Sequence, residues 1–141
     1  MTTKFNRNIQ SLENIFKFIE EFVTLHQLDD SISFAINLAV DELFTNMVKY
    51  HPDNPNDISI SLKKTADKVI VTLTDYEVEP YNIKNVRDYD TTQPLQNRKP
   101  GGIGILLVKK FIDDIDYTYQ HGISKITLVK YLEKNNVRDK N

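Results

Sequence analysis

Hydrophobic residues recur at helical spacing in two stretches near the amino-terminal end of the chain. Between residues 9 and 25, the apolar side chains that share one helical face are Ile9, Leu12, Ile15, Phe16, Ile19, Phe22 and Val23. Between residues 31 and 50, the corresponding set is Ile32, Ile36, Ala39, Val40, Leu43 and Met47. A one-sided apolar stripe has to face a core. The pattern therefore predicts two amphipathic, core-facing helices.

Polar residues and a proline set the expected ends of the second helix. A polar break separates the two stripes and offers Asp30 or Ser31 as the residue that caps the helix start. Pro52 disfavours helical conformation in the preceding residue, His51. We therefore expect the second helix to end near His51.

Two later stretches alternate apolar and polar residues and predict an antiparallel hairpin. They cover residues 58–62 and 69–75. In the second stretch, one face carries Val69, Val71, Leu73 and, at its end, Asp75. A carboxylate on an apolar face is costly unless something donates hydrogen bonds to it. Asp75 either opens a turn or accepts a hydrogen bond from a ligand's N–H group.

The remaining chain predicts a long connection, one helix and a second hairpin. Residues 76–100 lack periodicity, and a connection of this length suggests an active-site lid, although a disordered surface segment would have the same composition. An apolar helix follows, and strands at 115–119 and 123–132 flank a His121-Gly122 turn. Because the strands cluster in hairpins, the expected fold is α+β: a two-layer sandwich with helices on one face of a mixed, mostly antiparallel sheet.

Length and composition narrow the functional classes. The 141 residues predict a single domain at residues 1–133 followed by a polar tail at residues 134–141. A net charge of −2 disfavours bulk attraction to nucleic acid or to an anionic membrane. No apolar run approaches the ~18 residues of a transmembrane helix. The chain has no cysteine, which excludes a thiolate nucleophile. A cytoplasmic location is the default expectation.

Two further groups of residues are candidates for chemistry. Glu42 and Asn46 stand four residues apart, so they share a helix face at the margin of the apolar stripe. Taken alone, such a pair is more simply a solvated surface pair. Gly101, Gly102 and Gly104 are three of the four glycines in the chain, and they precede the apolar helix. Such a cluster lets backbone N–H groups approach an anion, or it forms a tight turn.

Taken together and in this order, these signals resemble the GHKL superfamily of Bergerat-fold ATPases. The likeness is to the stand-alone anti-sigma-factor serine/threonine-protein kinases of bacteria in particular. The segment at residues 39–46, Ala-Val-Asp-Glu-Leu-Phe-Thr-Asn, matches that family's N-box. The segment at residues 100–114, which begins Pro-Gly-Gly-Ile-Gly, matches its second glycine box. The resemblance runs from about Phe5 to Tyr131.

The resemblance implies roles for individual residues. Glu42 would be the catalytic general base, and Asn46 would hold Mg²⁺ between the phosphates of ATP. Asp75 would accept a hydrogen bond from the adenine amino group. The residues expected to bind ATP or ADP through the lid are Lys99, Gly101, Gly102, Ile103 and Gly104. The implied protein substrate is a serine of a STAS-domain anti-sigma-factor antagonist, and the implied second partner is a sigma factor. Members often form dimers, which would make this chain a homodimer.

Three positions depart from the family pattern. Glu77 stands where glycine is usual and adds a negative charge near a polyanion; Tyr50 replaces a histidine and Ser124 an asparagine found in many members. Two functions therefore remain open. Glu42 favours an active kinase, because a pure binder needs no base, whereas Glu77 favours a nucleotide-weakened module that acts by sequestering a partner. A sensor histidine kinase fragment is disfavoured, because only one predicted helix precedes the N-box helix.

Overall fold

The computed structural model describes residues 1–78 and 102–133, with the backbone alone at residues 102–105. The helices and strands follow the predicted order, with one additional strand at the amino-terminal end. In chain order they are β1 (Thr2–Phe5), a 3₁₀ turn (Ile9–Ser11), α1 (Leu12–Leu25), α2 (Asp30–Tyr50), β2 (Ile58–Lys64), β3 (Lys68–Tyr76), α3 (Gly102–Phe111), β4 (Asp114–Gln120) and β5 (Ile123–Tyr131). The predicted polar tail, residues 134–141, lies outside the described residues.

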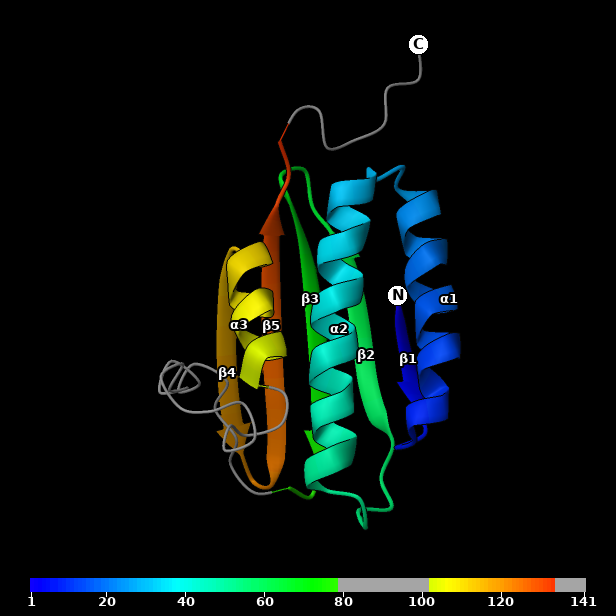
Figure 1. The fold of residues 1–141 in the computed structure, drawn as a ribbon, viewed down its shortest axis with the longest axis vertical. Helices are drawn as coiled ribbons and strands as arrows, with labels where there is room; N and C mark the ends of the chain where they lie inside the picture. The colour runs from blue at the N-terminus through cyan, green and yellow to red at the C-terminus, as the bar shows by residue number, and fades with distance from the viewer. Residues whose placement is uncertain (79–101, 134–141) are drawn as a thin grey trace.

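The strands form one sheet, and the helices cover one of its faces (Figure 1). The strand order is β1-β2-β3-β5-β4, and every pairing among the described strands is antiparallel. This arrangement confirms the predicted two-layer α+β fold. β3 lies at the centre of the sheet, and both β3 and α2 end at the same end of the molecule (Figure 1). The end of β3 therefore meets the end of the N-box helix.

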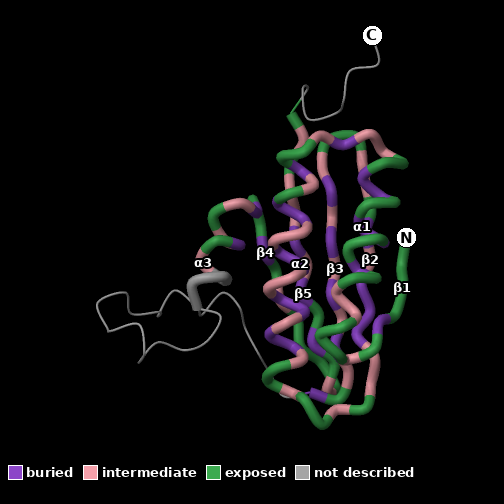
Figure 2. Tube along the Cα trace, turned by 45° about the vertical axis from the view of Figure 1, so that its right-hand side comes forward, coloured by how far each residue is buried: buried purple, intermediate pink, exposed green. Residues whose placement is uncertain are grey.

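The core lies between the sheet and the helices, where buried positions alternate along the strands and recur along α2 (Figure 2). The predicted stripe of α2 is confirmed, because all six of its residues are buried. In the predicted stripe of the first helix, the assignment of Ile9 and Phe16 to the core face is wrong, because 46% and 38% of their surfaces are exposed. Phe18 is buried instead, and its ring packs edge-on against Phe5 with 5.6 Å between ring centroids. The buried face of α1 is rotated toward β1.

The strand β1 was not predicted from the sequence. It has only four residues, and a single buried apolar residue, Phe5, stands at its end, so it carries no alternating pattern. It pairs with β2 in the register Thr2 with Ser61 and Phe5 with Ile58. The backbone of β2, which the sequence did predict, supplies the hydrogen-bonding partner for this edge strand.

The start of α2 corrects a second expectation. The capping residue is Asp29 rather than Asp30 or Ser31: its carboxylate accepts a hydrogen bond from the Ile32 backbone N–H at 3.1 Å and one from the Ser31 hydroxyl at 2.7 Å. Asp30 is the first helical residue. The three neighbouring polar residues all have capping chemistry, and the sequence did not distinguish among them.

Removal of this cap should weaken the long helix that carries Glu42 and Asn46. We expect Asp29→Ala to lower the free energy of unfolding by about 1 kcal/mol, because the Ile32 N–H loses its acceptor. Urea unfolding followed by circular dichroism measures the change. The matched control is Asp30→Ala, one residue further on. An equal loss in both variants would mean that the cap is not specific to Asp29.

Candidate functional site

A pocket lies at the end of the molecule where α2 and β3 both finish. Its lining residues come from the last turns of α2, the end of β3 and the adjacent strand β5: Asn46, Met47, Tyr50, His51, Asp75, Val78 and Ser124. The pocket has about 280 Å³ of empty volume, its open mouth included. Two predicted site residues, Asn46 and Asp75, therefore line the same pocket.

Glu42 and Asn46 are in contact on the face of α2, as their spacing predicted. The Asn46 amide nitrogen donates to a Glu42 carboxylate oxygen at 3.4 Å. Asn46 is 2% exposed, whereas Glu42 lies between core and solvent. Burial raises the pKa of Glu42, the hydrogen bond from Asn46 opposes that rise, and the neighbouring Asp41 charge adds to it. Glu42 is therefore a stronger base than a fully solvated glutamate.

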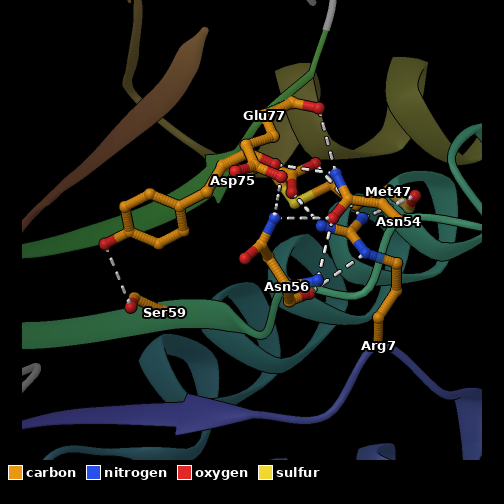
Figure 3. A network of polar contacts seen from close by, with 8 residues as sticks. Arg7, Met47, Asn54, Asn56, Ser59, Asp75 and Glu77 are labelled. Carbon is orange, nitrogen blue, oxygen red and sulfur yellow. Dashed lines mark hydrogen bonds and ion pairs between the residues drawn. The ribbon is translucent and has the colours of Figure 1, made fainter.

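Asp75 lies on the buried face of β3, as the strand parity predicted, and is 2% exposed. Its partner is a residue that the sequence did not single out (Figure 3). Both carboxylate oxygens accept hydrogen bonds from the guanidinium of Arg7: Nη1 donates to Oδ2 at 3.4 Å, and Nη2 donates to Oδ1. The Arg7 side chain is 3% exposed. The cost of a buried carboxylate was the one signal in the sequence that a strong donor must be nearby.

Arg7 is itself held by two backbone carbonyl groups. Its Nε donates to the Asn56 carbonyl and its Nη1 to the Met47 carbonyl, each at 3.2 Å. Arg7 follows β1, Met47 belongs to α2, and Asn56 lies in the loop that joins α2 to β2. One guanidinium therefore ties three separate segments of the chain to Asp75 (Figure 3).

Glu77, which replaces the usual glycine of the family pattern, adopts a left-handed backbone conformation with φ of 56°. Glycine enters this region without steric cost, whereas a residue with a side chain does not. Two loop asparagines hold it there (Figure 3). The Asn56 amide donates to the Glu77 carboxylate at 2.8 Å, and the Asn54 amide donates to the Tyr76 and Glu77 carbonyls at 2.7 and 3.2 Å. The glycine-like conformation is therefore kept, and the added carboxylate is bound to Asn56.

The tip of the β4–β5 hairpin anchors the residue after Glu77. The Val78 N–H donates to the Gly122 carbonyl at 3.0 Å, and the Tyr119 hydroxyl donates to the Val78 carbonyl at 2.8 Å. Ser124, the second departure from the family pattern, is directly opposite Asp75 in the strand register and is buried. Tyr50, the third, is half exposed at the pocket's edge.

The predicted lid and glycine cluster are described only in part. The segment at residues 79–101, which contains Lys99 and Gly101, lies outside the described residues. Gly102, Ile103 and Gly104 form the first turn of α3, which corrects the expectation that this cluster precedes the helix. The N–H groups of a first helical turn have no intrahelical acceptor. These residues can therefore still offer N–H groups to an anion, from within the helix.

The fold and the pocket together define the class of protein. The chain belongs to the histidine kinase-like ATPase domain family, whose sequence model matches residues 5–130. Membership of this family implies that the domain binds a nucleotide.

Within that class, the chain is similar to bacterial serine-protein kinases. It is 24% identical over 110 residues to the serine-protein kinase RsbW of Listeria monocytogenes, covering 74% of this chain and 69% of that protein. It is 23% identical over 109 residues to RsbW of Bacillus cereus, covering 74% and 67%. These relatives confirm the predicted likeness to anti-sigma-factor serine kinases. The fold is also similar to a chain of the SiaB–SiaC complex of Pseudomonas aeruginosa, with a TM-score of 0.60, 10% identity and coverage of 94% and 89%.

Two observations apply to residues 1–78 and 102–133 only. No helix among them combines the length and hydropathy needed to cross a membrane. No three of their histidine, aspartate and glutamate side chains form a group that could hold a metal ion.

Proposed function

We propose that this protein is an ATP-dependent protein serine kinase and anti-sigma factor. It phosphorylates a serine of a STAS-domain anti-sigma-factor antagonist and, in its other state, holds a sigma factor. The observation that carries the proposal is the Glu42–Asn46 pair beside a pocket that also contains Asp75. The similarity to proteins named serine-protein kinases supports it. A cytoplasmic location and a homodimer stay predictions.

In this proposal the pocket binds the adenine of ATP. Met47 and Val78 offer apolar surface to the flat faces of the base, and both line the pocket. Asp75 accepts a hydrogen bond from the exocyclic amino group, which guanine lacks at the same position. A buried carboxylate in a pocket with a mainly apolar surface would both orient the base and distinguish adenine from guanine.

The pair on α2 performs the chemistry at the other end of the nucleotide. Because the Asn46 amide nitrogen faces Glu42, its amide oxygen is the atom suited to Mg²⁺, which prefers oxygen ligands. Mg²⁺, when bound, neutralises charge on the phosphates. Glu42 takes the proton from the substrate serine hydroxyl as that oxygen bonds to the γ-phosphorus of ATP; the bond from that phosphorus to the bridging oxygen breaks, and ADP leaves with the bond's electrons.

The alternative is a binding module that sequesters a partner without catalysis. One observation favours it: both oxygens of Asp75 already accept hydrogen bonds from Arg7. If the ion pair blocks the site on Asp75 that adenine would use, the domain does not bind ATP.

A thermal-shift titration with Mg²⁺ and ATP, ADP or GTP separates the two functions. Ligand at 100 times its dissociation constant stabilises the folded state by about 2.7 kcal/mol, which raises the melting temperature measurably. The kinase requires a shift with ATP and ADP and a much smaller one with GTP. No shift at millimolar Mg-ATP would instead support the binding module. Phosphoserine detection on a STAS-domain protein from the same organism then tests transfer itself.

The side chain at position 77 provides a test of the departure from the family pattern. We expect Glu77→Gly to tighten Mg-ATP binding by about threefold to tenfold, because it removes a screened negative charge beside the pocket that the polyanionic nucleotide would enter. Calorimetric titration measures the change. Glu77→Gln is the matched control, since it removes the charge and keeps the side chain that Asn56 binds. Tightening in both variants assigns the effect to charge; tightening in the glycine variant alone assigns it to the backbone. Unchanged affinity in both would contradict the expectation.

A further inference from the structure

Arg7 has no part in the chemistry proposed above, yet it forms an ion pair with Asp75, which lines the pocket. We propose that Arg7 is a positioning residue: it fixes the carboxylate of Asp75 in the orientation that reads the adenine amino group. This inference rests on the proposed function. It makes the segment between β1 and α1 part of the machinery that selects the base.

The geometry of the pair determines which lone pairs of Asp75 remain for a ligand. Arg7 approaches both carboxylate oxygens with two nitrogens of one planar guanidinium. A two-pronged contact of this kind fixes the plane of the carboxylate as well as its position. Each carboxylate oxygen accepts about two hydrogen bonds. Asp75 can therefore keep both contacts with Arg7 and still accept an N–H from a ligand in the pocket that it lines.

The contacts that hold Arg7 argue against an arrangement in which a nucleotide displaces Arg7 from Asp75. Its remaining contacts are to backbone carbonyls of Met47 and Asn56, and its side chain is 3% exposed. A guanidinium that swung away from Asp75 would lose its contact to α2 and its contact to the loop before β2 as well. Met47 also lines the pocket. The same contacts that hold Arg7 thus connect it to the surface on which the base would lie.

The charges around Asp75 give Arg7 a second role in recognition. The titratable groups that line the pocket with Asp75 are Tyr50 and His51 at the end of α2, Tyr76 and Glu77 follow Asp75 along the chain, and Arg7 contacts it. Arg7 is the permanent cation among them. It allows an acceptor-only group to be buried where the base would bind. Asp75 then offers only acceptors, which match the N–H donors of an amino group.

The test compares two nucleotides that differ only in the group that Asp75 would read. Calorimetric titrations with Mg²⁺ give the dissociation constants of ATP and of purine riboside triphosphate, which lacks the exocyclic amino group. The parent should prefer ATP by about 10- to 150-fold, the value of a hydrogen bond to a charged acceptor. In Arg7→Met the preference should fall to within about threefold, chiefly by loss of ATP affinity. Arg7→Lys should keep an intermediate preference, because an ammonium group can hold one oxygen but not fix the plane.

A matched control separates positioning from general loss of structure. Val23→Ala removes buried volume close to the carboxyl end of α1, and that end of the helix lies at the opposite end of the molecule from the end of β3 (Figure 1). This variant should leave the preference for ATP unchanged. If Arg7 had only a structural role, its replacement would weaken the binding of both nucleotides equally, and the ratio of their dissociation constants would not change. If Arg7→Met does not fold, the ratio in Arg7→Lys decides the question.

The outcomes for the two proposals are distinct. Strong ATP preference in the parent and an unchanged ratio in both Arg7 variants would overturn the inference and leave the proposed function standing. Equal binding of the two nucleotides by the parent would also overturn it, because Asp75 would then not read the amino group. Absence of any Mg-ATP binding by the parent would refute the proposed function, and the inference would fail with it.

Discussion

Replacement of Glu42 by glutamine is expected to slow phosphoryl transfer to the serine substrate by about 10²- to 10⁴-fold, the usual contribution of a positioned general base. The amide has the size of the carboxylate but cannot take up the serine proton. Mg-ATP affinity should change by less than about threefold, because Glu42 is not among the described residues that line the pocket. Single-turnover transfer rates and calorimetric titrations measure the two effects separately.

The neighbouring carboxylate supplies the control for this experiment. Asp41 precedes Glu42 on α2, and its carboxylate accepts a hydrogen bond from the Thr45 hydroxyl at 3.2 Å. Asp41→Asn therefore removes a negative charge from the same stretch of helix while the Glu42 carboxylate stays in place; the pKa of Glu42 should fall in this variant, because the Asp41 charge raises it. A rate in Glu42→Gln equal to that of the parent would remove Glu42 from its assigned role. Equal loss in both variants would assign the effect to local charge.

Features that local chemistry determines could be predicted from the sequence. The apolar stripe of α2 is buried as its 3.6-residue period required, and the parity of β3 placed Asp75 on the core side. The contact between Glu42 and Asn46 follows from the same helical geometry. Each of these inferences needs only the residues of one element, which is why a single sequence was sufficient.

The features that were missed depend on contacts between distant parts of the chain. Arg7 and Asp75 are separated by 68 positions, and nothing around Arg7 distinguishes it from a surface arginine. The strand β1 forms because β2 offers an edge, and the buried position of Phe18 follows from Phe5. The sequence could show that a buried carboxylate needed a donor, but it could not show which residue would supply it.

Loss of Arg7 alone is expected to cause the largest drop in stability of any substitution considered. Arg7→Met leaves the carboxylate of Asp75 buried without its main donor, and breaking a buried ion pair in this way typically costs about 3–5 kcal/mol. Both side chains are at most 3% exposed, so solvent cannot replace the lost contact. Urea unfolding of Arg7→Met, Asp75→Leu and the double variant forms a complete double-mutant cycle.

The double variant shows whether the pair is needed for stability or for recognition. With both charges gone and apolar side chains in their place, the protein should recover most of the loss, because apolar replacements of buried ion pairs are often nearly neutral. The exposed pair of Glu13 and Lys17, whose side chains are 81% and 72% exposed, is the matched control and should show coupling below about 0.5 kcal/mol. A loss below about 1 kcal/mol in Arg7→Met would contradict the prediction. A further outcome is a double variant that is stable and yet binds ATP and purine riboside triphosphate equally. That result would mean that the ion pair is dispensable for folding but required for selection of the base.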